Sequence, residues 1–318
     1  VTDFSKTTTA DEVVAVYGER VKGKTFLITG PSPASIGATT AYSLAAGGAA
    51  TLILIGRSAS KIAPVVDRIC DINATTQVLI FEADLSSIAS VRAAAQQILD
   101  STVTHIDVMT NNAGIMAGPH KKSVDGVELQ FATNHIGHFL LTNLLMPLLR
   151  ASSDGGRVVS VSSSGHRIAE LAPRWDPLLE HGTPYDQWQS YGFSKTANIL
   201  FTKSLTNRGL AAYSVHPGAI LTGLQANITP ETLQAARSFF ASSINTFPDV
   251  DGFRKSQEQG ASTQVLAAVC PPGSFENGSY LFNCAPCLPS AQAQDAGGNL
   301  AEELWKLSER VVDQEFKA

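Results

Sequence analysis

Residues 24–58 read KTFLITGPSPASIGATTAYSLAAGGAATLILIGRS and contain a complete βαβ unit. Two short apolar runs, residues 24–30 and 51–58, have the composition of buried strands, and the Ala-rich segment between them reads as a helix that ends at Gly47 and Gly48. A glycine-bearing turn joins the first run to this helix. In such a unit the first turn is where a dinucleotide pyrophosphate meets a helix N-terminus. The stretch therefore predicts a dinucleotide-binding unit.

The same rhythm continues along the rest of the chain. Five further apolar runs lie at residues 78–85, 105–114, 156–164, 211–218 and 278–284, with helical patterns between them. Continuous apolar runs are typical of parallel strands that are covered on both faces. The sequence therefore predicts an α/β fold, namely a doubly wound parallel sheet of about seven strands with helices on both faces.

Length and composition favour one domain. The chain has 318 residues, of which 44% are hydrophobic and 16% charged, enough to bury one large α/β core. We expect this domain over residues 24–318, preceded by a more polar arm or short helix at residues 1–23. A net charge of −5 gives no basic footprint for nucleic acid. No apolar run reaches the length of about 18 residues that a membrane span needs, so we expect no membrane span.

The cysteines suit a reduced, cytoplasmic protein. Cys284 and Cys287 form a C-x-x-C pair without the second pair that would complete a zinc site, so we expect no metal. No charged-then-apolar signal peptide opens the chain, which favours a cytoplasmic location. A leader removed before Val1 stays an open alternative.

Tyr191 and Lys195 form the main candidate for chemistry. The sequence that follows them, TANILFTKSL, has apolar residues at helical spacing, so a separation of four residues places both side chains on one helix face. An ammonium within a few ångströms favours the phenolate and lowers the pKa of a tyrosine. The pair is therefore a candidate acid/base for an alcohol or carbonyl carbon.

This pair belongs to a longer series of motifs. In chain order they are Thr29-Gly30 with Gly37, Arg57, Asp84-Leu85, Asn111-Asn112-Ala113-Gly114, Asn134-His135-Ile136-Gly137-His138-Phe139, Ser162-Ser163 with His166, Tyr191 to Lys195 with Ala197-Asn198, and His216-Pro217-Gly218. In these motifs, and in the C-terminal segment 293–309, the chain resembles the short-chain dehydrogenase/reductase family. Within that family it is similar to the retinol dehydrogenase and WW-domain oxidoreductase branch and its soluble fungal relatives. The resemblance runs from about residue 24 to the end and implies a single-domain Rossmann fold with a nicotinamide cofactor.

The resemblance also implies a catalytic serine. Ser163 is favoured because His166 follows it three positions later, as in the branch's Val-Ser-Ser-x-x-His pattern. Ser162 and Ser164 stay open as alternatives. In the family's scheme this serine orients the substrate oxygen while charge develops on it.

Three further catalytic roles follow from the resemblance. Tyr191 exchanges a proton with the substrate oxygen, and Lys195 binds the nicotinamide ribose and lowers the pKa of Tyr191. Asn134 anchors a water that carries the proton to solvent. The implied catalytic set is Asn134, Ser163, Tyr191 and Lys195.

The phosphate loop departs from the family pattern Thr-Gly-x-x-x-Gly-x-Gly. In TGPSPASIG, Ser35 stands where the middle glycine is expected, and the loop is one residue longer. A serine there must either tolerate the close approach of the pyrophosphate or donate its hydroxyl to a phosphate oxygen. The two prolines of the loop also remove two N–H donors. We expect the cofactor still to bind, with a locally different loop geometry.

Charge at the end of the second strand predicts NADP(H). NAD-specific sites place an acidic residue there, whereas this chain has no Asp or Glu between residues 20 and 66. Arg57 is placed to fork onto a 2′-phosphate, with Ser58 and Lys61 beside it. The alternative is that Arg57 is only a surface residue near a helix start.

The full cofactor set combines these positions with those that the resemblance implies. By resemblance, Asp84 bonds near the adenine amino group, Asn112 lines the adenosine pocket, and Ile220 and Thr222 meet the carboxamide. The expected cofactor-binding residues are Gly30, Ser32, Ser35, Ile36, Gly37, Arg57, Ser58, Lys61, Asp84, Leu85, Asn112, Ala113, Gly114, Tyr191, Lys195, Pro217, Gly218, Ile220 and Thr222.

Two insert regions, residues 166–189 and about 224–260, are expected to shape the substrate pocket. The first carries Trp175, Tyr185 and Trp188, and the second falls where the family places its mobile substrate lid. Aromatic and aliphatic side chains dominate both, which favours a bulky, mostly apolar small molecule as substrate.

The sequence therefore predicts an NADPH-dependent oxidoreductase acting on a carbonyl or alcohol carbon. Two alternatives stay open, namely a non-redox cyclase or isomerase that uses NADP(H) as a scaffold and a regulatory protein that senses it. By resemblance, the helices that carry Asn134 and Tyr191 form a dimer face, so we expect a homodimer.

Overall fold

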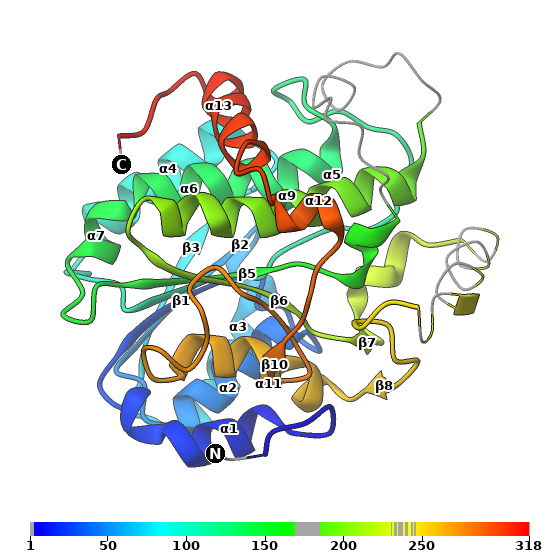
Figure 1. Ribbon diagram of the computed structural model, residues 1–318. Helices are drawn as coiled ribbons and strands as arrows, with labels where there is room; N and C mark the ends of the chain where they lie inside the picture. The colour runs from blue at the N-terminus through cyan, green and yellow to red at the C-terminus, as the bar shows by residue number, and fades with distance from the viewer. Residues whose placement is uncertain are drawn as a thin grey trace.

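The computed structural model describes residues 3–168, 185–229 and 246–317, together with residues 231, 234, 238, 241, 242 and 244. These residues form an eight-stranded sheet in the order β10-β9-β6-β5-β4-β1-β2-β3 (Figure 1). The strands are β1 (Thr25–Thr29), β2 (Thr51–Gly56), β3 (Gln77–Glu82), β4 (Val108–Asn111), β5 (Arg157–Val161), β6 (Ala211–His216), β9 (Tyr280–Phe282) and β10 (Ala285–Pro286).

The pairing of these strands confirms the predicted doubly wound sheet. Every neighbouring pair is parallel except β9 and β10, and β10 is a two-residue edge strand that the apolar runs did not indicate. The strand order runs outward in both directions from β1 and β4. Doubly wound folds bind their ligands at the carboxyl ends of the strands where the order reverses.

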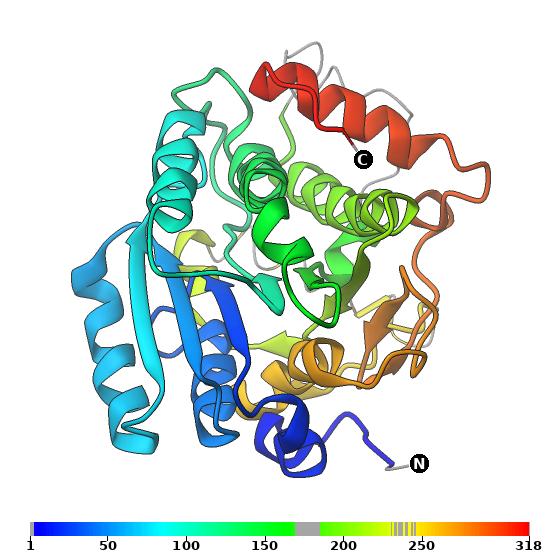
Figure 2. The ribbon, with the colours of Figure 1, turned by 90° about the vertical axis from the view of Figure 1, so that its left-hand side faces the viewer.

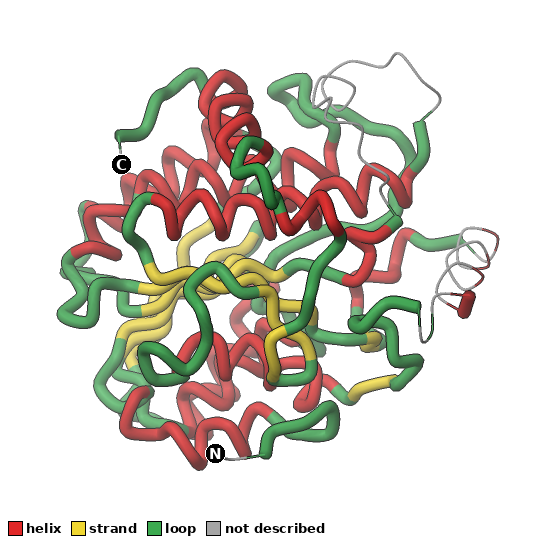
Figure 3. The backbone as a smooth tube through the Cα atoms, viewed as in Figure 1, coloured by secondary structure: helices red, strands yellow, loops and turns green. Residues whose placement is uncertain are grey.

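Helices cover both faces of the sheet, as Figure 2 and Figure 3 show. One face carries α4 (Ile88–Leu99), α6 (Gly137–Leu144) and α9 (Gln187–Asn207), with α13 (Leu300–Val312) outside them. The other face carries α2 (Ile36–Ala46), α3 (Ala59–Ile72) and α11 (Gln257–Val269), with α1 (Ala10–Tyr17) outside them. The chain is therefore a three-layer α/β structure with an additional helix on each side.

β1 shows why the strands read as continuous apolar runs. Leu27 belongs to the core beneath α4, α6 and α9, whereas Phe26 and Ile28 belong to the core beneath α2 and α11. All three side chains are buried. Because alternate residues of a strand point to opposite faces, a strand covered on both faces needs an apolar residue at every position.

The segment predicted as an arm or short helix packs against the domain. Helix α1 starts with a capping box in which the Thr9 hydroxyl accepts from the Glu12 N–H at 3.3 Å and the Glu12 carboxylate accepts from the Thr9 N–H at 2.7 Å. Ala10 and Val13 are fully buried among residues of α2 and α11. Residues 10–17 are thus part of the domain's second core.

The C-terminal helix α13 covers the outer side of α6 and α9 (Figure 2). The Trp305 ring meets the Phe139 ring edge-on at 4.9 Å between centroids and lies 6.0 Å from the Phe201 ring. The guanidinium of Arg208 stacks on Trp305 at 3.6 Å. This aromatic contact occupies part of the helix face on which the sequence analysis placed a homodimer, so a partner could use only the remainder of that face or another surface.

Shorter elements complete the described chain. They are η1 (Gly18–Arg20), α5 (Leu129–Phe131), η2 (Ala132–Ile136), α7 (Met146–Arg150), η3 (Ser164–Arg167), β7 (Ala219–Ile220), η4 (Gly223–Asn227), β8 (Arg254–Lys255) and α12 (Ala291–Gln294). β7 and β8 pair with each other in a separate two-stranded parallel sheet. Within the part of the chain that the structure describes, no helix combines the length and the apolar character that crossing a membrane requires.

Candidate active site

The predicted site residues gather at one edge of the sheet, where its parallel strands end. The residues that follow β1 to β6 there are, in order, Gly30, Arg57, Asp84, Asn112, Ser163 and Pro217. Because the carboxyl ends of parallel strands share one edge, residues far apart in the chain meet in one place. This edge is the candidate active site.

The structure brings Tyr191 and Lys195 together on α9. The helix starts at Asp186, whose carboxylate accepts hydrogen bonds from the N–H groups of Trp188 and Gln189, each at 2.8 Å. Both candidate side chains are nearly inaccessible, at 4% and 3% exposure. The Lys195 ammonium lies 5.7 Å from the centroid of the Tyr191 ring and donates to the carbonyl of Val161 at the end of β5 at 3.0 Å.

Ser163 is the serine of its cluster that faces Tyr191. Its hydroxyl accepts from the Gly165 N–H at 3.0 Å, and its interaction with the Tyr191 phenol lowers the pKa of that phenol. A Cβ added at Gly165 would lie 2.7 Å from Tyr191 Cε1, so only glycine lets this turn approach the tyrosine ring so closely. Ser162 is turned away, because its hydroxyl donates to the Lys195 carbonyl at 2.8 Å.

Burial dominates the protonation of the Tyr191–Lys195 pair. It raises the pKa of Tyr191 to about 12, although the hydrogen bond with Ser163 lowers it in part. Burial also lowers the pKa of Lys195 to about 8. The ammonium was predicted to lower the pKa of Tyr191, whereas in this structure burial of the phenol sets the direction of the shift and only Ser163 opposes it. At neutral pH the phenol is therefore protonated and most of the lysine is charged.

Asn134 lies beside this pair in η2, a π-helical turn. Its amide donates to the Ile115 carbonyl at 3.0 Å and to the Ser194 hydroxyl at 2.9 Å, and its oxygen accepts from the Ile115 N–H at 2.8 Å. π-turns of this kind are frequent at functional sites. Because both amide hydrogens are used within the protein, the predicted water could meet this side chain only at its oxygen.

Thr29 and His138 connect Asn134 to the first strand. The Thr29 hydroxyl accepts from the N–H groups of Asn112 and Ala113, each at 2.9 Å, so its own hydrogen is directed to His138 Nε2 at 2.8 Å. The other ring nitrogen, Nδ1, then carries the proton and donates to the Asn134 carbonyl at 3.0 Å. Burial lowers the pKa of His138 to about 4, so at neutral pH the ring is neutral, as its two hydrogen bonds require.

The turn between β1 and α2 has the shape of a cofactor cradle. Gly30 has a φ of +70°, and a Cβ at Gly37 would lie 2.4 Å from the side-chain nitrogen of Asn112. The first amide groups of α2 have no intrahelical acceptor, as at any helix start, and can receive a phosphate. Among the residues that the structure describes, none forms a hydrogen bond with the buried side-chain oxygen of Asn112. The donors and the tight glycine contacts fit a dinucleotide.

Ser35 takes the capping role in this loop. Its hydroxyl accepts from the Ala38 N–H at 3.1 Å, and it is the N-cap of α2. The left-handed conformation falls one residue earlier, at Ala34, which has a φ of +58°. The glycine that is missing from the family pattern was predicted to be replaced by Ser35. Because the loop is one residue longer, the residue with the left-handed conformation lies one position before Ser35.

A carboxylate that the sequence analysis missed lies at the end of β2. The N–H of Ala59, the first residue of α3, donates to the Glu82 carboxylate at 2.6 Å, and Glu82 is the register partner of Gly56 on the neighbouring strand. Ser58 bonds to the Ser60 hydroxyl at 2.8 Å, and Arg57 is exposed. The predicted 2′-phosphate position therefore has both a cation and an anion beside it.

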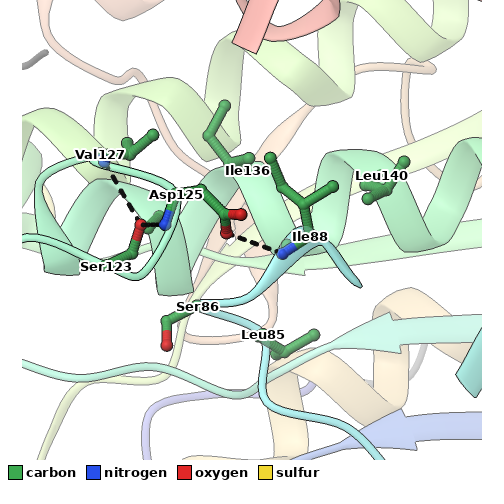
Figure 4. Close-up of a pocket in the computed structure, with 10 residues that line it drawn as sticks. Leu85, Ser86, Ile88, Ser123, Asp125, Val127, Ile136 and Leu140 are labelled. Carbon is green, nitrogen blue, oxygen red and sulfur yellow. Dashed lines mark hydrogen bonds between the residues drawn. The ribbon is translucent and has the colours of Figure 1, made fainter. Parts of the chain in front are cut away.

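Leu85, one of the two residues predicted at the adenine, lines a small pocket that Figure 4 shows in close-up. The Asp84 carboxylate accepts from the Ser86 N–H at 2.9 Å, and the Asp125 carboxylate bonds to the Ile88 N–H at 2.9 Å. The residues that line the pocket are Leu85, Ser86, Ile88, Ser123, Asp125, Val127, Ala132, Ile136, Gly137 and Leu140. None of the four predicted catalytic residues is among these described lining residues, so the pocket is not the catalytic cleft.

The loop after β6 carries the residues predicted for the nicotinamide end. Pro217 and Gly218 lead into β7, where Ile220 pairs with Lys255 of β8. The Thr222 hydroxyl caps η4 by accepting from the Leu224 N–H at 3.3 Å. Between them, Leu221 is 80% exposed, which leaves an apolar side chain in solvent next to the site.

Comparisons with known proteins identify the family. A family model described as short chain dehydrogenase matches residues 24–171. The short-chain dehydrogenase/reductase prx1 of Penicillium rubens is 35% identical, over 93% of this chain and 86% of its own. The chain belongs to the short-chain dehydrogenase/reductase family. Retinol dehydrogenase 12 of Mus musculus is 34% identical, over 93% of this chain and 88% of its own.

A solved structure supports the same placement. The crystal structure of an uncharacterised protein from Mycobacterium paratuberculosis has a TM-score of 0.69 and 32% identity, covering 93% of this chain and 96% of that one. WW domain-containing oxidoreductases also match. Together these matches confirm the predicted branch, which joins retinol dehydrogenases, WW-domain oxidoreductases and fungal relatives.

This short-chain dehydrogenase/reductase also contains a buried polar cluster that the sequence analysis missed. Asp249 is 1% exposed, forms an ion pair with Arg167, and accepts from the Tyr280 hydroxyl at 2.7 Å. The neighbouring ring of His166 packs edge-on against Tyr280 at 5.3 Å. The cluster joins the turn after Ser163 to the end of the region predicted as a lid. No sequence motif marks this contact, since its parts come from distant segments.

The two insert regions of this short-chain dehydrogenase/reductase are described only in part. Residues 169–184, including Trp175, and residues 230, 232–233, 235–237, 239–240, 243 and 245 lie outside the described residues. The other two named aromatic residues, Tyr185 and Trp188, are described: the Tyr185 hydroxyl donates to the Glu128 carboxylate at 3.1 Å, and the Trp188 ring meets the Tyr191 ring edge-on at 6.4 Å between centroids. Burial raises the pKa of Tyr185 to about 12, so this second phenol is also neutral.

Proposed function

We propose that this protein is an NADPH-dependent oxidoreductase that interconverts a carbonyl and an alcohol carbon of a bulky, mostly apolar small molecule. The observation that carries the proposal is the convergence of the half-buried Ser163 with the buried Tyr191 and Lys195 at the carboxyl edge of the sheet. A regulatory sensor would not need a tyrosine and an ammonium held in this way, and oxidation of NADPH during turnover separates an oxidoreductase from a scaffolded isomerase.

The chain's own residues would hold the cofactor along this edge. The start of α2 with Gly30, Ser32, Ser35, Ile36 and Gly37 would receive the pyrophosphate. The positions further along the edge are Arg57, Ser58 and Lys61 for a 2′-phosphate, Asp84 and Leu85 for the adenine, Asn112, Ala113 and Gly114 for the adenosine, and Pro217, Gly218, Ile220 and Thr222 for the carboxamide. When bound, the nicotinamide supplies or accepts the hydride.

Tyr191 is suited to donate a proton in the direction of reduction. With a pKa raised to about 12 the phenol carries its proton at neutral pH, and Ser163 is within hydrogen-bonding reach of the same position. The Gly165 N–H already occupies one acceptor site of Ser163 Oγ, which leaves the serine O–H to donate to a substrate oxygen. The two groups therefore place two donors on the oxygen that becomes the alcohol.

Lys195 acts on the product of that step. Loss of the proton leaves a phenolate, and the ammonium 5.7 Å from the ring centroid stabilises it. A lysine whose pKa is lowered to about 8 also exchanges protons readily near neutral pH. Asn134, through its oxygen, is proposed to anchor the water through which the proton returns from solvent.

The proposed substrate class rests on apolar surface beside the site. Leu221 is 80% exposed in the loop between Ile220 and Thr222, and a side chain of this kind is suited to contact an apolar substrate. A relative is named for retinol, an apolar alcohol, which agrees with the proposal. The substrate is proposed to be a small molecule, the location cytoplasmic, and the assembly a homodimer that leaves the α13 contact intact.

The test is an activity assay with NADPH and a panel of lipophilic ketones and aldehydes. The loss of NADPH absorbance gives the rate, and mass spectrometry identifies the product. Tyr191→Phe should lower kcat by about 10² to 10⁴, the usual contribution of general acid catalysis, and leave NADPH binding within a few-fold. Tyr213→Phe is the matched control, because Tyr213 is 3% exposed in the opposite core and should lose no activity. A Tyr191→Phe enzyme with wild-type turnover, or product formed without NADPH oxidation, would refute the proposal.

A further inference from the structure

Ser163 is held by an unusual number of contacts for a residue in a turn. Two donors meet its main-chain carbonyl: the His166 N–H at 3.0 Å and the His166 ring nitrogen Nδ1 at 2.6 Å. The Gly165 N–H meets its side-chain oxygen at 3.0 Å. The backbone and the hydroxyl of the serine are thus fixed separately, and His166 supplies both contacts to the backbone.

The His166 ring has a single tautomer that satisfies its surroundings. Its Nε2 accepts from the Ser290 N–H at 3.0 Å, so it carries no hydrogen, and Nδ1 must then be the donor to the Ser163 carbonyl. The Asp249 carboxylate, 3.8 Å from Nδ1, favours a proton on that same nitrogen. The ring is fully buried, and burial lowers the pKa of His166 to about 4, which keeps the neutral form.

The groups around the ring are themselves anchored. Asp249 accepts from Tyr280 and pairs with Arg167, and a second nitrogen of Arg167 donates to the Leu288 carbonyl at 2.6 Å. The His166 carbonyl accepts from the Thr196 hydroxyl at 3.4 Å, one position after Lys195. His166 therefore contacts the serine turn, α9 and the loop that contains Ser290. A shift of any of these three segments would move the imidazole.

We propose that His166 is a positioning residue that fixes the Ser163 turn, and with it the direction of the serine hydroxyl, through the Nδ1–H bond to the Ser163 carbonyl. The inference rests on the proposed function, because that function gives Ser163 its role in the reaction. A misplacement of about 1 Å at a reacting group costs roughly a hundredfold in rate. Loss of this bond should therefore lower kcat and leave the affinity for NADPH almost unchanged, because the residues proposed to hold the phosphates and the adenosine follow other strands.

Two substitutions test the roles of the two ring nitrogens separately. His166→Asn keeps a donor at the place of Nδ1, and His166→Gln keeps an acceptor at the place of Nε2. We expect H166Q to lose roughly 10- to 100-fold in kcat, H166N to keep at least ten times the kcat of H166Q, and the KM for NADPH to stay within about threefold in both. The reverse order, or an H166Q enzyme with wild-type kcat, overturns the inference.

A second comparison excludes a merely structural effect. In a Ser163→Ala background, H166Q should cause no further loss of kcat, because a residue that acts through Ser163 has nothing left to position. The same loss in both backgrounds overturns the inference. Wild-type kcat in Ser163→Ala itself would instead overturn the proposed function, and the two failures are thereby distinguished.

A measurement on the unmutated protein guards against variants that do not fold. The ¹⁵N chemical shifts of labelled histidine at neutral pH should show His166 protonated at Nδ1 and bare at Nε2. The opposite tautomer, or a ring in exchange between both, would overturn the inference without any substitution.

Discussion

Arg57 directly follows β2, and Glu82 ends the neighbouring strand β3 as the register partner of Gly56, so the predicted 2′-phosphate position has residues of opposite charge near it. Arg57 is exposed. The Glu82 carboxylate accepts from the first N–H of α3, which would otherwise be free to donate to the phosphate. A charge-assisted bidentate contact is worth about 1.5 to 3 kcal/mol, and exposure to solvent reduces it. The Glu82 carboxylate reduces the free energy of this contact further. We therefore expect the wild type to prefer NADPH over NADH by roughly tenfold in kcat/KM, which corresponds to the lower end of that energy range.

Substitutions at these two residues should move the cofactor preference in opposite directions. Glu82→Gln removes a negative charge beside the phosphate and should raise the NADPH/NADH ratio of kcat/KM several-fold, whereas Arg57→Asp should abolish or reverse it. Asp67→Asn is the control, since Asp67 is an exposed carboxylate eight residues along α3, about 12 Å away at the rise of a helix. Equal use of both cofactors by the wild type, or a ratio that Arg57→Asp leaves unchanged, would reduce Arg57 to a surface residue.

Among the elements, the loop from Gly30 to Gly37 departs most from the pattern of its family. Ala34 holds a φ of +58°, a conformation that costs an alanine about 1 to 2 kcal/mol. Its carbonyl accepts from the Gln257 side chain of α11 at 2.8 Å, which helps to hold the strained residue in place. The loop keeps its shape through its contacts, although alanine does not favour that shape.

Ala34→Gly should therefore stabilise the protein by about 0.5 to 1 kcal/mol, because relief of the backbone strain exceeds the extra entropy of glycine in the unfolded chain. The same change at Ala89, an exposed position within α4, should destabilise it by about 0.5 to 1 kcal/mol. Urea unfolding of both variants checks the pair. Destabilisation by Ala34→Gly would mean that the loop is not strained at this residue.

Elements and their order were predictable from local patterns, and contacts between elements were not. The apolar runs indicated the seven parallel strands, and the spacing of Tyr191 and Lys195 indicated their common helix face. Glu82 meets the start of α3 from 23 positions away, and Asp249 meets Arg167 from 82 positions away. Such contacts depend on which strands and loops lie side by side, which the periodicity of a single segment does not encode.

At the scale of the whole molecule, four imidazoles among the described residues are buried and neutral. Burial lowers the pKa of His135 and His216 to about 3 and of His138 and His166 to about 4, from an ordinary value of 6.5. Below pH 6.5 the unfolded chain binds protons that the folded chain does not. The stability contributed by these four groups is therefore complete above pH 6.5 and is lost as the pH falls toward 4.

Unfolding near pH 5 should accordingly take up about four protons from these rings, so that the free energy of unfolding falls by roughly 5 kcal/mol per pH unit. Denaturant titrations at closely spaced pH values give this slope. His216→Phe, which keeps a ring to stack on Phe282, should reduce the uptake by about one proton. A slope near zero around pH 5 would contradict the burial of these rings.

The place of α13 in chain order, after α6 and α9, has a consequence for how the protein is made. Trp305 is synthesised more than 100 residues after Phe139 and Phe201, the two rings that it covers. Until α13 has left the ribosome, the nascent chain therefore presents these aromatic rings to its neighbours and to chaperones. A chain cut short before α13 would leave the two rings without this cover for its whole lifetime.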